Sequence, residues 1–81
     1  MARKILVVDD TRNMQTMLRD FLETHDFEVI VAGDGVEALN ALKTNMVDLI
    51  LLDIMMPNMD GFQFITQLKR TSSIPVIMVT A

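Results

Sequence analysis

The stretch KILVVDD, residues 4–10, indicates the fold class of this 81-residue chain. It contains four consecutive apolar residues, Ile5 to Val8, three of them β-branched, and it ends in two acids, Asp9 and Asp10. A short apolar run without polar alternation is typical of a strand that is buried on both faces, as in parallel sheets. The sequence therefore predicts a buried strand at residues 5–8 with an acid pair at its carboxyl end.

Helical and strand patterns alternate through the rest of the chain. β-rich runs at residues 27–32, 47–52 and 75–80 predict three further strands. Apolar residues three and four positions apart predict a helix before each of these strands. The positions that mark the three helices are Met14, Met17, Leu18, Phe21 and Leu22; Ala38, Leu39 and Leu42; and Phe64, Ile65 and Leu68. The order β-α-β-α-β-α-β predicts an α/β fold with a parallel sheet and right-handed crossovers.

Composition and charge narrow the classes of function. The chain is 51% hydrophobic, which supports one small folded domain, and it has no cysteine for a disulfide, a thiolate metal site or a thiol nucleophile. Its net charge of −4 argues against direct binding of nucleic acid or of an anionic membrane. The apolar runs are too short for a signal peptide or a membrane span. We therefore expect a cytoplasmic protein without nucleic-acid or membrane partners.

Polar residues follow three of the predicted strands. Asp9 and Asp10 follow the first strand, Asp53 follows the third, and Thr80 closes the fourth. Ligands of open parallel sheets bind outside the carboxyl ends of the strands, so we expect three carboxylates and one hydroxyl to converge there. Some basic residues open a strand or close a helix, which places them toward the opposite edge: Lys4, Lys43, Lys69 and Arg70.

This convergence of acids favours a metal site. Clustered carboxylates repel one another, and Mg²⁺ prefers a few oxygen ligands with room for water and phosphate; Mn²⁺ is the alternative cation. Helix capping by solvated acids is the competing interpretation, but it explains Asp10 and neither Asp9 nor Asp53. A carboxylate in a metal site can bind the cation, act as a general base, or attack phosphorus to form an acyl phosphate. The chain has no glycine-rich phosphate loop, which disfavours nucleotide binding.

Three segments of the sequence resemble one known family. They are KILVVDD (residues 4–10), VDLILLDIMMPNMDG (residues 47–61) and PVIMVTA (residues 75–81), and they are similar to the receiver domain of two-component response regulators, the CheY-like phosphoacceptor module. The resemblance implies a flavodoxin-like parallel sheet with helices on both faces. It also implies a module that takes a phosphoryl group from a histidine kinase or a phosphotransfer protein, with Mg²⁺ or Mn²⁺, and that is not an enzyme in the usual sense.

The resemblance assigns a role to five positions. Asp53 would be the phosphorylated aspartate. Asp10 would bind the cation directly, Asp9 mainly through water, and the backbone carbonyl of Met55 would be a further metal ligand. Thr80 would be the switch hydroxyl that turns toward the phosphoryl group.

The resemblance covers about two-thirds of the family's domain, with four of the five strands of a 2-1-3-4-5 sheet. The fourth helix, the fifth strand and the fifth helix are missing, and with them the lysine that follows the fifth strand. We therefore expect weak phosphotransfer and a homo-oligomer formed through the face that those elements would cover. Two alternatives stay open: a self-associating half-domain without phosphotransfer, and a metal-dependent phosphohydrolase. The second is disfavoured because Met55, not an acid, stands two residues after Asp53.

Overall fold

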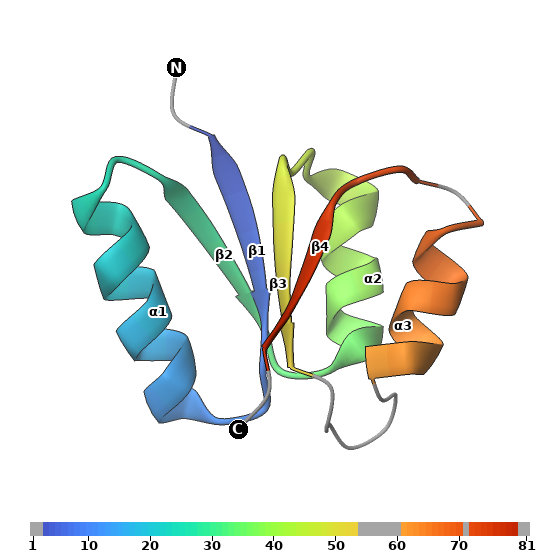
Figure 1. Ribbon diagram of the computed structural model, residues 1–81, viewed down its shortest axis with the longest axis horizontal. Helices are drawn as coiled ribbons and strands as arrows, with labels where there is room; N and C mark the ends of the chain where they lie inside the picture. Colours follow the sequence, from blue (N-terminus) through green and yellow to red (C-terminus); the bar gives the residue numbers. More distant parts are fainter. Residues whose placement is uncertain (1–2, 54–60, 71, 80–81) are drawn as a thin grey trace.

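The computed structural model describes residues 3–53, 61–70 and 72–79, and this part of the chain forms a parallel sheet with helices on both faces (Figure 1). The strands are β1 (Lys4–Val8), β2 (Glu28–Ala32), β3 (Leu49–Asp53) and β4 (Val76–Val79), in the order β2-β1-β3-β4. The helices are α1 (Arg12–Thr24), α2 (Gly35–Thr44) and α3 (Gly61–Leu68). α1 covers one face, and α2 and α3 cover the other (Figure 1). The predicted α/β fold class is confirmed.

The observed strands agree with the predicted ranges to within two residues. The largest difference is at β3, which starts at Leu49 rather than at Val47 and includes Asp53. Asp53 belongs to the strand because it is still in register with Val79 of β4. The predicted end of the fourth strand, Thr80, lies outside the described residues.

The main core lies between the sheet and the helices α2 and α3. Alternate residues of a strand face the same side, so four residues of β1 and β3 meet side chains from the two helices. The buried members of this cluster from these elements are Leu6, Val8, Ile50 and Leu52 from the strands, and Ala38, Phe64 and Leu68 from the helices. The other face of β1 is also covered, because Ile5 is 3% exposed and Val7 is 1% exposed. The prediction that this strand is buried on both faces is confirmed.

Helix α1 is packed less tightly than the sequence pattern suggested. No residue of α1 is fully buried. Met14, Leu18 and Leu22 are partly buried, but Met17 is 58% exposed and Phe21 is 60% exposed. Met17 is one of the apolar residues that mark this helix, but it does not fill a core position, because the apolar stripe is wider than the contact that α1 makes. None of the described helices is long and apolar enough to cross a lipid bilayer.

Candidate metal centre

Three carboxylates meet at the carboxyl ends of two neighbouring strands. β1 and β3 pair in parallel up to Val8 and Leu52, so Asp9, Asp10 and Asp53 leave the sheet at the same edge. One carboxylate oxygen from each residue lies within 4.8 Å of the other two. The predicted convergence of the three acids is confirmed. Met55 and Thr80 lie outside the described residues, so their predicted roles stay predictions.

Asp9 is the anchored member of the group. Its side chain is buried, with 6% of the residue exposed, and its Oδ1 accepts a hydrogen bond from the backbone N–H of Thr11 at 2.8 Å. Its own N–H donates to the carbonyl of Ala32 at 3.0 Å. Its carbonyl accepts from Nε2 of Gln15, a residue that the sequence pattern did not single out. Asp9 therefore holds a fixed position at the end of β1.

Asp10 is exposed, and Asp53 is partly buried. The residue at the N-cap of α1 is Thr11, and its side chain makes no capping hydrogen bond. Asp10 precedes the cap, so the interpretation that Asp10 is present as a helix cap is wrong for this structure. The acid pair is positioned by the end of β1 and by the turn that follows it.

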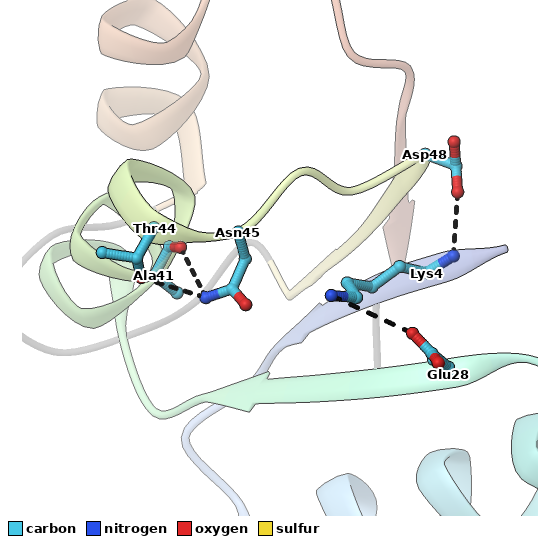
Figure 2. A network of polar contacts seen from close by, with 6 residues as sticks. All are labelled: Lys4, Glu28, Ala41, Thr44, Asn45 and Asp48. Carbon is cyan, nitrogen blue, oxygen red and sulfur yellow. Dashed lines mark hydrogen bonds and ion pairs between the residues drawn. The ribbon is translucent and has the colours of Figure 1, made fainter.

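Basic side chains are held at the other end of the sheet. Figure 2 shows Lys4 at the start of β1, where its Nζ lies 3.9 Å from Oε2 of Glu28. The backbone N–H of Lys4 donates to Oδ2 of Asp48 at 2.8 Å. Lys43 lies in the last turn of α2. Lys4 and Lys43 therefore lie at the edge opposite the acids, as predicted. Arg12 differs from them: it is the first residue of α1, so it follows the acid pair closely in the chain, and it is exposed.

Side-chain hydrogen bonds cap the carboxyl end of α2. Asn45 is the C-cap residue, and its Nδ2 donates to the carbonyl of Ala41 at 2.9 Å and to Oγ1 of Thr44 at 3.2 Å (Figure 2). Asn45 therefore ends this helix. The chain then continues from this cap to the start of β3 at Leu49.

The three acids form a donor set that suits a hard divalent cation. All the candidate ligand atoms are carboxylate oxygens, one residue is buried, and the others are partly or fully accessible. Mg²⁺ is bound by one or two carboxylates while it keeps several waters. A cation between these groups would also offset their mutual repulsion. The residues present therefore fit such an ion.

Two other candidate features lie apart from this group. The single histidine, His25, is the C-cap of α1, at the end of the helix that is remote from the acids. Its Nδ1 lies 2.9 Å from the carbonyl of Phe21, and the two rings are 4.6 Å apart. A hollow between α2 and α3 is lined mainly by apolar residues such as Leu39, Leu42 and Leu68, and none of the three acids lines it.

Comparisons with known proteins agree with this geometry. The family model for the response regulator receiver domain matches residues 5–81. The transcriptional regulatory protein CpxR of Escherichia coli (strain K12) is 47% identical over 78 residues, which are 96% of this chain and 33% of that protein. The chain thus spans about a third of the length of the curated relatives it matches.

Solved structures match the fold closely. The chemotaxis protein CheY4 of Vibrio cholerae superposes with a TM-score of 0.92 and 33% identity, over 96% of this chain and 68% of that chain. The response regulator TrrA of Thermotoga maritima, solved in complex with Mg²⁺ and BeF, gives a TM-score of 0.91 and 32% identity, over 98% of this chain and 70% of that chain. The family match over nearly the whole sequence and the shared sheet lead to one assignment. The chain belongs to the response regulator receiver domain family.

Proposed function

We propose that this chain accepts a phosphoryl group on Asp53 from the phosphohistidine of a histidine kinase or a phosphotransfer protein, with Mg²⁺ or Mn²⁺ held by Asp9 and Asp10. The observation that carries the proposal is the meeting of three carboxylates from two strand ends within 4.8 Å. The match to the receiver family over residues 5–81 supports it. The solved relative TrrA, which is in complex with Mg²⁺ and BeF, supports the choice of cation.

The proposed step is an in-line transfer between nitrogen and oxygen. A carboxylate oxygen of Asp53 attacks the phosphorus, and the P–O bond of an acyl phosphate forms. The P–N bond to the donor histidine breaks, and its electron pair stays on the imidazole. Asp9 is a poor candidate for the nucleophile because its carboxylate is buried and accepts the Thr11 N–H.

A cation is required by charge balance in this proposal. The phosphoryl group adds about −1.5 to −2 charges to a site that already contains three carboxylates. A bound Mg²⁺ would supply positive charge that stabilises the oxygens of the transferred group. Asp10 is exposed at the strand end and would bind it directly, and Asp9 would contribute mainly through water. The backbone carbonyl of Met55 and the hydroxyl of Thr80 complete the proposed set.

We expect the 81-residue polypeptide to be phosphorylated poorly when it is tested alone. The resemblance implies that a lysine after a fifth strand orients the donor, and these 81 residues contain no counterpart to that segment. The low expected yield does not change the expected site.

Mass spectrometry after treatment with acetyl phosphate and Mg²⁺ tests the site. We expect the added phosphoryl group on Asp53 at well below one group per chain, and none in Asp53→Asn. The matched control is Asp20→Asn, which makes the same change at an exposed position of α1 and should leave the yield unchanged. A label that survives in Asp53→Asn would overturn the site. Stoichiometric labelling of the wild type would overturn the argument from the lysine.

A second proposal concerns association. In the described sheet β4 pairs with β3 alone, and its residues Ile77 and Met78 are 53% and 37% exposed. A β-rich strand with one unpaired edge can pair with a copy of itself. We propose that a second copy of the chain covers this edge.

A further inference from the structure

The turn between β1 and α1 is held from the helix side by Gln15. Asp9 lies one residue beyond the last ladder pairs of β1, which join Val8 to Ala32 and to Leu52. At this point the backbone of Asp9 is held by two contacts. Its N–H donates to the carbonyl of Ala32, and its carbonyl accepts a hydrogen bond from Nε2 of Gln15. Gln15 therefore connects the first turn of α1 to the residue that carries the buried carboxylate.

In the described part of the chain, no other side chain of α1 donates a hydrogen bond to the end of β1. The hydroxyl of Thr24 donates to the carbonyl of Asp20, which is a contact within the helix. No residue of α1 is fully buried, so apolar packing holds the helix only through partly buried side chains. The hydrogen bond from Gln15 is thus one of two directional contacts that tie the start of α1 to Asp9, the other being the hydrogen bond from the N–H of Thr11 to the Asp9 carboxylate.

We infer that Gln15 is a positioning residue for the cation site, an inference that rests on the proposed function. The carboxylate of Asp9 is held by the N–H of Thr11 at 2.8 Å, and the carbonyl of Asp9 is held by Gln15. With both ends of Asp9 fixed, the direction in which Asp10 leaves the strand is fixed as well. Groups that orient metal ligands without touching the metal change affinity by about 10- to 100-fold. Because Gln15 contacts a backbone carbonyl rather than a carboxylate, we expect its loss to weaken cation binding by about tenfold, at the lower end of this range.

Titration of the 81-residue chain with Mn²⁺ tests the inference. The variant Gln15→Met keeps the length of the side chain and removes the donor. Its dissociation constant for Mn²⁺ should be about tenfold higher than that of the wild type. Gln67→Met makes the same change at an exposed position of α3 and should leave the constant unchanged. A purely structural role would lower the melting temperature of the metal-free protein without changing the constant, and that result would overturn the inference.

A metal-free measurement separates this inference from the proposed function. The amide of Thr11 donates to Asp9, so its hydrogen exchange reports the order of the turn. Exchange at Thr11 should be faster in Gln15→Met and unchanged in Gln67→Met. If the wild type binds no Mn²⁺, the proposed metal site fails, and the exchange at Thr11 still decides whether Gln15 orders the turn. If Gln15→Met does not fold, Gln15→Asn, which keeps the amide but is one methylene too short, replaces it.

Discussion

Asp9 and Asp10 are adjacent in the sequence but lie in different environments. Neighbouring residues of an extended segment point to opposite sides, and here one is buried and the other is exposed. Asp9 is engaged by the turn that follows it, whereas Asp10 faces solvent. We therefore expect the loss of Asp10 to change cation binding with little effect on the fold.

The variant Asp10→Asn tests this expectation. A cation that binds only the native state stabilises it by about 2.7 kcal/mol at a concentration of 100 times the dissociation constant. Removal of one charged ligand should weaken binding at least tenfold, which lowers this gain by about 1.4 kcal/mol. Thermal unfolding with and without Mg²⁺ measures the change. We expect a clear upward shift of the melting temperature in the wild type and a smaller shift in Asp10→Asn.

The control for this experiment is Asp20→Asn. It changes the net charge by the same amount at an exposed position in α1, away from the acid group. Its melting temperature should rise on addition of Mg²⁺ by as much as that of the wild type. Without Mg²⁺, Asp10→Asn should be at least as stable as the wild type, because one of three repelling charges is gone. An equal Mg²⁺ shift in Asp10→Asn and in the wild type would reject the assignment of Asp10.

The residues of the acid group could be predicted because their position follows from a simple rule. An acid directly after an apolar strand lies at the carboxyl edge of a parallel sheet, and Asp9, Asp10 and Asp53 all satisfy this rule. Gln15 could not be predicted, because a glutamine inside a helix has no pattern that distinguishes a turn contact from a solvated side chain. Its role depends on where α1 lies relative to β1.

At the scale of elements, the end of α1 adopts a defined C-terminal motif. Asp26 has a φ of 68°, which is the left-handed region. The N–H of Asp26 donates to the carbonyl of Glu23, and the N–H of Phe27 donates to the carbonyl of Leu22. These two bonds form a Schellman motif, in which the left-handed position favours glycine. Asp26 therefore carries a conformational cost that glycine would avoid.

The variant Asp26→Gly should stabilise the protein by about 1 kcal/mol, because an L-residue in the left-handed region costs about 1–2 kcal/mol. Asp26→Asn should give a smaller gain, since asparagine tolerates this conformation and removes a negative charge from the carboxyl end of a helix. Urea unfolding measures both. Asp20→Gly is the control, because glycine is a slightly poorer helix former than aspartate and inside α1 should instead destabilise by about 0.3 kcal/mol. A variant Asp26→Gly no more stable than the wild type would contradict the prediction.

The elements themselves could be predicted better than their exposed faces. The period of the apolar residues identified the described helices, and short apolar or β-rich runs identified the described strands. The core residues Phe64 and Leu68 were on the predicted face of α3. The apolar pattern could not predict the exposure of individual apolar residues, such as Phe21, which is 60% exposed, and Met78, which is 37% exposed. A sequence pattern shows which face of an element is apolar, but the partner that covers it depends on the tertiary arrangement.

At the scale of the whole molecule, the parallel sheet gathers the acid group at one of its edges. All the carboxyl ends of the strands lie at one edge, where the three acids meet. The amino ends lie at the other edge, where Lys4 pairs with Glu28. The central position of β1 follows from the strand order, in which β2 and β3 flank it. This order brings Asp53 of β3 next to the acid pair of β1, so the site depends on the topology of the whole sheet.

Of the two edge strands of the described sheet, β2 and β4, the second leaves large apolar side chains exposed to solvent. Val76 packs against the main core, but Ile77, which is in register with Leu51, faces the opposite side and is 53% exposed. A second copy that pairs along β4 would cover this apolar surface, and burial gains roughly 25 cal/mol per Å². A two-fold axis at the edge would make the contact closed and symmetric. We therefore predict that the wild type sediments as a dimer or a larger species at low micromolar concentration.

The variant Ile77→Lys should shift this population toward the monomer, because a lysine on an edge strand opposes pairing with another edge. The matched control is Met46→Lys, which places the same charge on a side chain that is 92% exposed and lies outside the sheet. It should leave the sedimentation unchanged. If Ile77→Lys only unfolded the chain, circular dichroism would show lost helix together with the change in mass, whereas disrupted pairing retains helix in the monomer. A wild-type chain that sediments as a compact monomer and melts cooperatively would contradict association through β4, since the exposed edge would then be stable in water without a partner.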